Sequence, residues 1–481
     1  MEKCLAAGSP IRLCRYLFFA CFWRFLYVFK KLFVYLHFCF VCRVRAIALV
    51  ASAIWRTFDF LYMKFERNKT TIKVNVTSEI GHLNAVLLHT PGPEIERMTP
   101  ANAAEALYSD ILSKNIVDDE YKWFRGVFER CTNVFYVSDI LEQLLDDDDL
   151  CASLITQSCR AEGCEYLIDE MLMQDAKTIA RELIEGFPYR PGKDPERYAE
   201  RRYVLRPLYN LFFTRDASSS VYDRVLVNSM SFDVRKRENL IYKAIFKHYF
   251  GCEVMNAQEW NPDARTEGGD VQIGRSDLLC IGEGIRTNAK GIEFLAYKFS
   301  DRPKFNIIAQ QLPYQPESFI HLDMVYTFLD RDRCMMYEPM LRKTNEFAGK
   351  RTTRIEIDNG KVKYHDCKNM LEALKQVGMD MEPVFCGGDD LWNQQREQWH
   401  SGANFFALAP GKVIGYRRNT NTIDALDRAG FSVLRAEDVA EGRVSIDDYK
   451  RCVVTFAASE LPRAGGGARC MTMPINRDEL T

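Results

Sequence analysis

Apolar and polar positions along this chain repeat with two periods from Lys73 onward. Short runs of β-branched and aromatic residues predict strands, and longer segments with apolar residues at helical spacing predict amphipathic helices, several of which end at a glycine. The order strand, helix, strand recurs five times. The predicted pairs of strands are 85–89 and 134–137, 224–227 and 252–255, 278–281 and 305–309, 361–364 and 383–386, and 412–416 and 431–434. The helices that bridge them are predicted near 101–112, 238–250, 290–299, 369–377 and 422–429.

Each of these units is too small to bury its own apolar face, so we expect the five units to pack against one another. Their spacing fits two arrangements equally, a ring closed around one axis and an ordinary α/β sheet. The polar motifs favour the ring, because each of them falls at a junction between units. These junctions are 210–216, 267–273, 320–332, 402–410 and 465–474. The sequence therefore predicts an α/β fold in which the junctions converge on one central cavity.

One segment, residues 139–206, interrupts the repeated pattern. It has helical spacing at 166–173 and 176–185, shows no strand signal, and ends near a turn-rich stretch at 187–192. We expect a helical insert between the first and second units. The acidic run at 146–149 inside it indicates a solvated face or loop, and metal binding is the less favoured interpretation. The predicted division of the chain is an extension at 1–62, a first unit at 63–138, the insert at 139–206, and the other units with the C-terminal loop at 207–481.

Residues 1–62 differ from everything that follows, because they are aromatic and aliphatic with isolated arginines and lysines. Their longest uncharged runs, 32–42 and 46–55, are shorter than the roughly 18 to 20 apolar residues that a membrane span needs. Three interpretations stay open: a basic helix that lies on a membrane surface, a spanning segment, or a segment absent from the working protein, since Met63 stands just before the globular sequence. A secretory signal is disfavoured, because no apolar core ends at a small-residue cleavage site.

Composition excludes some classes of partner and of site. The 481 residues are 47% hydrophobic and can build a sizeable core, while a formal net charge of −2 gives no polycation for nucleic acid. Five of the 16 cysteines lie in the first 62 residues, and the other eleven are scattered and odd in number. This is no disulfide framework, so we expect a reducing compartment, the cytoplasm. Cys39 and Cys42 form a C-x-x-C pair with no second pair to complete a zinc site.

The candidate chemistry begins with a glycine-rich run at 465–474, which places the thiol of Cys470 next to the cation of Arg469. A lone cysteine is more often a small buried apolar residue than a nucleophile. Three motifs upstream change this interpretation, namely Phe-Thr-Arg-Asp at 213–216, Glu-Gly-Gly-Asp at 267–270 and His-Leu-Asp at 321–323. A cysteine, a histidine and several carboxylates are the groups needed to attack a cationic carbon centre.

The acidic and imidazole groups of these motifs predict a pocket for a cation. His321 and Asp323 stand two apart in an apolar stretch read as a strand, so they are expected to project from one face. Glu267 and Asp270 flank a pair of glycines that lets the backbone approach a ligand. Several carboxylates around one pocket are costly without a cation, and a guanidinium matches paired carboxylates bidentately. A metal ion is the competing explanation, but one histidine and no regular ligand spacing argue against it.

These motifs resemble those of the arginine deiminase family, in the guanidine-modifying, amidinotransferase-like superfamily. The resemblance runs from about Val74 to the C-terminus and includes Asn75–Gly81, Val86–Gly92, the three motifs above, Arg396–Trp399 and the sequence Ala-Arg-Cys-Met-Thr-Met-Pro at 468–474. It implies a five-bladed pseudosymmetric propeller of ββαβ units, and a helical insert where the pattern is interrupted. No metal and no organic cofactor is implied.

The resemblance also implies hydrolysis of free L-arginine to citrulline and ammonia. Cys470 would attack the guanidinium carbon, and His321, oriented by Glu267, would act as general acid and then as general base. Asp216 and Asp323 would hold the guanidinium nitrogens. The implied groups for the rest of the substrate are Arg235 and Arg286 for the α-carboxylate, Asn210 as their assistant, and Asp270 as a support of the site. Some family members have an arginine where this chain has Gly465, which leaves open whether Arg463 or Arg469 meets substrate.

Three alternatives accompany this hypothesis. Two are sister activities on the same fold, either transfer of the amidino group to an amine or hydrolysis of another guanidino compound such as a methylarginine or agmatine. The third is a non-catalytic relative bound to a membrane through residues 1–62, which is disfavoured because Cys470 and His321 are both present. We also expect a homo-oligomer and no nucleic-acid partner.

Overall fold

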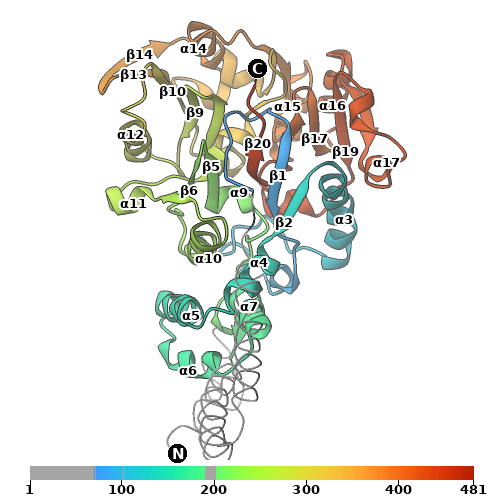
Figure 1. Ribbon diagram of the computed structural model, residues 1–481. Helices are drawn as coiled ribbons and strands as arrows, with labels where there is room; N and C mark the ends of the chain where they lie inside the picture. The colour runs from blue at the N-terminus through green and yellow to red at the C-terminus, as the bar shows by residue number, and fades with distance from the viewer. Residues whose placement is uncertain (1–69, 71, 101, 190–201, 481) are drawn as a thin grey trace, which may run out of the picture.

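The computed structural model describes residues 70, 72–100, 102–189 and 202–480 (Figure 1). The predictions for residues 1–62, a membrane-surface helix, a spanning segment or a dispensable extension, lie outside the described residues. Among the described residues, no helix is both long enough and apolar enough to cross a bilayer.

Five sheets in the described part of the chain share one pairing pattern, in which a middle strand pairs antiparallel with one neighbour and parallel with the other. The middle strands are β1 (Leu83–Leu88), β6 (Arg224–Val227), β9 (Leu278–Glu283), β12 (Arg333–Met336) and β17 (Lys412–Tyr416). Their antiparallel partners are β20 (Met473–Arg477), β5 (Ser218–Val221), β8 (Val271–Arg275), β11 (Tyr326–Phe328) and β16 (Phe406–Ala409). Their parallel partners are β2 (Asn133–Tyr136), β7 (Glu253–Met255), β10 (Phe305–Gln311), β15 (Glu382–Phe385) and β19 (Cys452–Phe456). The fold is thus α/β with mixed sheets.

Each parallel connection needs a crossover, which here contains a helix. The crossover helices are α3 (Lys114–Cys131), α10 (Glu238–Ala244), α12 (Ala289–Lys298), α14 (Met370–Gln376) and α16 (Thr420–Arg428). Shorter helices at other positions are α9 (Thr214–Ala217), α11 (Ala257–Trp260), α13 (Glu338–Arg342), α15 (Leu391–Trp399) and α17 (Ala436–Ala440). Glycines 251, 378 and 430, which the sequence placed at helix ends, all have a positive φ, as a helix-terminating glycine requires.

The two ends of the described chain meet in one sheet. Strand β20, near the C-terminus, pairs antiparallel with β1, and Figure 1 shows them side by side. Helix α3 follows β1 and packs against the last sheet, with the Phe124 ring 5.0 Å from that of Phe456 and the Phe128 ring 5.6 Å from that of Phe406. The first and last sheets are therefore neighbours, held together by buried aromatic contacts.

All ten strands of the five predicted pairs are confirmed, and so are four of the five bridging helices. The helix predicted at 101–112 is wrong. Residues 102–107 form a single turn, because Leu107 takes a φ of 66°, which an α-helix does not allow. The crossover helix of this unit is instead α3, which buries Val117, Tyr121 and Phe124 at helical spacing.

The grouping of two predicted strands is also wrong. Strand β14 (Lys361–Cys367) pairs with β13 (Thr352–Asp358), and this hairpin extends the sheet of β9 and β10 instead of pairing with β15. Strand β18 (Ser432–Arg435) pairs with β19, which separates it from β17 in the sheet. Both are outer strands of their sheets. A strand's local pattern predicts that it forms but not which neighbour it pairs with, since pairing depends on the register of distant segments.

Helices fill the segment between β2 and the small ladder of β3 (Phe187–Pro188) and β4 (Tyr203–Leu205). They are α4 (Val137–Leu144), α5 (Asp148–Glu162), α6 (Ile168–Leu172) and α7 (Ala176–Glu185). In Figure 1, α5, α6 and α7 form a lobe below the sheets. The acidic run starts α5, because the Asp147 carboxylate accepts hydrogen bonds from the amides of Asp149 and Leu150. No metal-binding group of acidic, histidine or cysteine side chains is found among the described residues.

Candidate active site

The loop that carries Cys470 is held between two anchors. On its C-terminal side it enters β20, whose pairing with β1 fixes the direction of the chain. On the other side Gly466 and Gly467 pack so closely that a Cβ at either position would overlap the Phe213 ring or the Asn404 side chain. The Arg215 amide also donates a hydrogen bond of 3.1 Å to the Cys470 carbonyl oxygen. Two of the motifs predicted to converge, 213–216 and 465–474, are thereby joined through the backbone.

Asn404 contacts the Cys470 thiol directly and was not predicted from the sequence. Its Nδ2 donates to Cys470 Sγ at 3.2 Å, and its Oδ1 accepts from the amides of Arg469 at 2.8 Å and Cys470 at 3.3 Å. Only its place in the junction 402–410 signalled that it might face the cavity. Asn404 fixes both the loop backbone and the sulfur position.

His321 lies between two carboxylates. Its Nε2 is 3.0 Å from Glu267 Oε2, and its Nδ1 is 3.9 Å from Asp216 Oδ1. Burial by itself would lower the pKa of His321, but Asp216 and the hydrogen bond to Glu267 outweigh it and raise the pKa to about 9. Burial acts to raise the pKa of Glu267, yet Arg286 and His321 hold it below its usual range. The pair is therefore an imidazolium and a carboxylate at neutral pH.

The prediction that His321 and Asp323 lie on a strand is wrong. His321 precedes a short turn at Leu322–Met324, and the strand, β11, begins only at Tyr326. The cause is Asp270, whose Oδ1 accepts a 2.9 Å hydrogen bond from the Leu322 amide and holds the backbone in the turn. His321 and Asp323 thus reach the site from a turn and not from a shared strand face.

Asp323 connects the thiol to a buried ion-pair network. Its Oδ2 is 3.7 Å from Cys470 Sγ and accepts a 2.9 Å hydrogen bond from Arg469 Nη1. The same guanidinium meets both oxygens of Glu79, each at 3.1 Å. Burial raises the pKa of Asp323, opposed by Arg469. Burial also acts on Glu79, but Arg469 lowers its pKa to about 2. Glu79 was part of the recognised sequence pattern, with no role attached to it.

The two arginines expected at the substrate carboxylate are engaged by acids of the site. Arg235 Nη1 donates to Asp216 Oδ2 at 2.7 Å, and Arg286 Nη1 is 3.1 Å from Glu267 Oε2. The Arg286 guanidinium also lies 4.5 Å from the centroid of the Phe232 ring. Asn210 donates through Nδ2 to the Ala106 carbonyl at 2.8 Å. These contacts offset the negative charge of buried carboxylates, which would be costly if left alone.

The free thiol is held in its neutral form. Burial raises the pKa of Cys470 well above its usual value, and the nearby Asp323 and Asp216 raise it further. Arg469 opposes this only weakly, because its guanidinium is committed to Glu79 and Asp323. Arg469 thus lowers the pKa of the thiol, but burial and the two carboxylates outweigh it. A second cation next to the sulfur would be needed to generate the thiolate.

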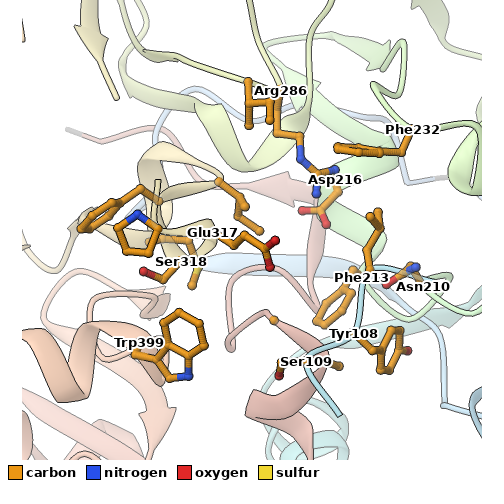
Figure 2. Close-up of a pocket in the computed structure, with 18 of the residues that line it drawn as sticks. Tyr108, Ser109, Asn210, Phe213, Asp216, Phe232, Arg286, Glu317, Ser318 and Trp399 are labelled. Atoms are coloured by element: carbon orange, nitrogen blue, oxygen red, sulfur yellow. The ribbon is translucent and has the colours of Figure 1, made fainter. Parts of the chain in front are cut away.

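A cavity of about 350 Å³ leads toward these groups (Figure 2). Asp216, Asn210, Arg235 and Arg286 line it, and Gly465 forms part of its wall. The remaining predicted site residues do not line it and are at most 1% exposed, namely Cys470, His321, Glu267, Asp323 and Asp270. Asp216 is thus the point at which the open cavity meets the buried cluster.

A pH dependence of stability follows from Asp270. Burial raises its pKa from 3.8 to about 7, so the folded protein keeps this carboxyl protonated at pH values where the unfolded chain has lost the proton. Stability that is fully present below pH 3.8 is therefore lost as the pH rises toward about 7. In Asp270→Asn this loss is absent. The urea midpoint of wild type minus that of the variant should therefore fall steadily from pH 4 to 7. A difference that does not change with pH would contradict the assignment.

Comparison with known proteins gives a consistent set of relatives. A family model described as "Arginine deiminase" matches residues 105–477. The arginine deiminase of Mycoplasma capricolum subsp. capricolum is 32% identical over 423 residues, which cover 85% of this chain and 98% of that protein. The arginine deiminase of Clostridium perfringens is 30% identical over 430 residues, with the same coverage of 85% and 98%.

Among solved structures, similarity is found to the N-terminal domain of ArgZ, an arginine dihydrolase from cyanobacteria, at 14% identity and a TM-score of 0.47. The match covers 82% of this chain and 99% of that one. SxtG, an amidinotransferase from Microseira wollei, matches at 14% identity with a TM-score of 0.47, covering 85% and 98%.

Proposed function

This chain belongs to the arginine deiminase family and deiminates arginine, and from this premise we propose which residues carry the reaction. The reaction is hydrolysis of free L-arginine to L-citrulline and ammonia through an amidino group covalently bound to Cys470. One observation supports this assignment most strongly. The Cys470 thiol lies 3.7 Å from Asp323 in the same buried cluster as His321 and Asp216, where a planar cation would meet all four groups.

Two carboxylates offer acceptors for the substrate guanidinium. Asp216 Oδ1 and Asp323 Oδ1 are both buried and have no hydrogen-bond partner in the described structure. Their other oxygens are bound by Arg235 and Arg469, which fix the orientation of each carboxylate. We propose that guanidinium N–H groups donate to the two free oxygens and so align the central carbon with the sulfur. The entering positive charge also lowers the pKa of the thiol, which loses its proton to solvent as the thiolate forms.

The covalent steps then follow from the protonation states. The Cys470 thiolate attacks the guanidinium carbon, and the imidazolium of His321 donates a proton to one terminal nitrogen, which leaves as ammonia. Neutral His321 next removes a proton from a water molecule that attacks the amidino carbon. Collapse of this second adduct, with loss of its hydroxyl proton to solvent, breaks the C–S bond, releases citrulline and returns the thiolate. Glu267 orients the imidazole and stabilises its charged form, and Asp270 holds the turn that carries His321.

The α-carboxylate of the substrate is assigned to Arg235 and Arg286, assisted by Asn210. Both arginines line the cavity while remaining bound to acids of the site. Arg286 Nε has no hydrogen-bond partner in the described structure, so this guanidinium keeps a donor available for a carboxylate. Arg286 could offer its Nε without leaving Glu267. Arg235 has Nε and Nη2 bound to Glu238 and Nη1 bound to Asp216, so of its five N–H donors it would offer the second Nη1 hydrogen.

For the fold, we propose that the five sheets are the blades of a pseudosymmetric propeller, with residues 139–206 inserted between the first and second blades. Support comes from the shared pairing pattern and from β20, a strand near the C-terminus that pairs with β1 in the first sheet.

We also propose a cytoplasmic location, since the eleven cysteines of the described residues are free thiols. The homo-oligomer stays a prediction, for which light scattering is the test.

The reaction is tested with the full-length protein and free L-arginine, by following citrulline and ammonia in the same sample. Equal amounts of the two products are expected. Ammonia without citrulline, or amidino transfer that appears only when an amine acceptor is added, would overturn the hydrolytic assignment. Agmatine and the methylated arginines, assayed in parallel, distinguish the sister activities, because turnover of either in preference to arginine would reassign the substrate.

A glycine beside His321 provides a further prediction. A Cβ at Gly269 would overlap the His321 ring, although the backbone there does not require glycine. Gly269→Ala should therefore displace the imidazole from Glu267 and lower kcat by about 100-fold, the cost of a misplaced catalytic group. The pKa of His321 in the pH–rate profile should fall from about 9 toward 6.5. Gly274→Ala, whose Cβ would meet the Leu278 side chain and the edge of the Phe328 ring but no group of the site, serves as the control and should keep its activity.

A further inference from the structure

The cavity contains a carboxylate that the proposed mechanism does not use. Four lining residues carry formal charge, namely Asp216, Arg235, Arg286 and Glu317. The first three are engaged in ion pairs at the inner end of the cavity. Glu317 is exposed, and within the described part of the chain it has no ion-pair partner. Figure 2 shows its carboxylate directed into the cavity between Asp216 and Trp399.

The backbone that follows Glu317 is held by several contacts, and the Phe319 amide donates back to the Pro316 carbonyl at 3.1 Å. Ser318 donates through Oγ to Gln398 Oε1 at 2.8 Å, and Gln398 Nε2 donates back to the Ser318 carbonyl at 2.9 Å. The next residue, Phe319, is buried with its ring 5.3 Å from that of Phe347. Glu317 is thus a negative charge on an anchored turn and not at the tip of an unsupported loop.

The substrate presents one more charged group than the proposed site has partners for. The guanidinium is assigned to Asp216 and Asp323, and the α-carboxylate to Arg235 and Arg286. The α-ammonium group then remains, and a partly buried ammonium needs an acceptor. Glu317 is the unpaired anion of the same cavity, and in Figure 2 it enters from a different wall than Arg286.

We propose that Glu317 binds the α-ammonium group of the substrate and so makes the site selective for free amino acids over Nα-acylated or peptide-bound arginine. This inference rests on the proposed function, because it takes arginine as the ligand. A charge-assisted hydrogen bond between carboxylate and ammonium is the contact involved. Agmatine, which keeps the amine and lacks the carboxylate, would still meet Glu317 but would lose the contacts to the arginines.

The test compares substrates that differ only in this group. Full-length wild type and Glu317→Gln are assayed with L-arginine, Nα-acetyl-L-arginine and agmatine. The variant should lose about tenfold or more in kcat/KM on arginine, mainly through KM, as expected for a hydrogen bond to a charged group. The loss should be similar on agmatine and absent on the acetylated substrate. Glu317→Asp, which keeps the charge, should recover part of the arginine activity.

Bulk charge at the cavity entrance is controlled by Asp110→Asn. Asp110 is an exposed carboxylate beside Ser109, which lines the cavity, and it pairs with Arg463 without lining the cavity itself. This variant should discriminate arginine from its acetylated form as wild type does. An equal loss on all three substrates in Glu317→Gln, or an equal effect of Asp110→Asn, would reduce Glu317 to a general attractor of cations and overturn the proposal.

Binding measurements separate this proposal from the proposed function. Calorimetry on Cys470→Ala, with and without Glu317→Gln, measures the affinity for L-arginine and Nα-acetyl-L-arginine in the absence of turnover. Weaker binding of arginine alone in the double variant supports the subsite whatever the reaction is. Unchanged arginine affinity overturns it. If wild type forms no citrulline, the proposed reaction is overturned. The binding comparison still tests the role of Glu317, because it does not depend on turnover.

Discussion

Replacement of Cys470 by serine is expected to abolish citrulline formation, with kcat lower by at least about 10⁴-fold. A serine hydroxyl can still accept the hydrogen bond that Asn404 Nδ2 donates to the sulfur, so the loop should keep its conformation. What the variant lacks is a nucleophile that ionises when a cation arrives. The group that could act as a base, His321, has a pKa of about 9 and is protonated at neutral pH, so it cannot activate a hydroxyl.

The matched control is Cys367→Ser. Cys367 is a free, half-buried thiol on β14, the outer strand of a different sheet from the one that anchors the Cys470 loop. This variant should keep wild-type kcat, and both variants should melt within a few degrees of wild type. Single-turnover experiments with labelled arginine should trap label on wild type and on Cys367→Ser but not on Cys470→Ser. Citrulline formation above about a tenth of the wild-type rate in Cys470→Ser would show that another group is the nucleophile.

The fold was largely predictable because its strands and helices are encoded locally. The apolar runs at β6, β9 and β17 gave the strands, and spacing of apolar positions gave α10, α12 and α16. Pairing was not predictable in the same way, as β14 shows. Its residues are mostly exposed, so nothing in its pattern distinguishes an added outer strand from a member of the next unit.

The candidate site could be predicted only to the extent that its residues carry distinctive motifs. Cys470, His321 and Asp216 do meet in one buried cluster, as the motifs indicated. The roles of Asn404 and Glu79 were missed, because Asn404 lies in no distinctive motif and the motif that contains Glu79 does not reveal its partner. Glu79 also acts across 390 positions of sequence, through Arg469. Contacts of this kind depend on the closure of the fold, which local patterns do not encode.

The pairing of Arg235 and Arg286 with Asp216 and Glu267 has a physical reason that the sequence could not show. A site built to hold a cation contains buried carboxylates even when no cation is bound, and these need compensation in the free protein. The side chains that we propose for the substrate carboxylate are cations themselves, so they can serve both purposes. This explains why the same arginines line the cavity and bind acids of the cluster.

The largest expected effect on stability belongs to Arg469→Leu. In the wild type one buried guanidinium bridges Glu79 and Asp323, both of which are buried. Removal of the cation takes away the ion-pair partner of two buried carboxylates, with only the weaker influence of Arg215 and Arg477 left at Glu79. Breaking a buried ion pair in this way costs about 3–5 kcal/mol. The free energy of unfolding at neutral pH should fall by at least that amount. Arg469→Lys keeps the charge but loses the bidentate contact with Glu79, so its loss of unfolding free energy should be smaller.

The pH dependence of this loss identifies its cause. In the wild type the pKa of Glu79 is lowered to about 2, so its stabilising contribution is present above pH 4.5 and is lost as the pH falls toward 2. In Arg469→Leu the largest of the charges that oppose burial is gone, although Arg215 and Arg477 still lower the pKa of Glu79. The pKa values of Glu79 and of Asp323, which burial already raises, should both rise, so the variant should lose stability as the pH rises. Urea midpoints of the variant relative to wild type should therefore be closer at pH 5 than at pH 8. Glu79→Gln in the Arg469→Leu background should recover part of the loss at pH 8, because it removes one charge that has lost its ion-pair partner. A deficit that is the same at both pH values, and that Glu79→Gln does not relieve, would mean that packing and not charge makes Arg469 essential to the fold.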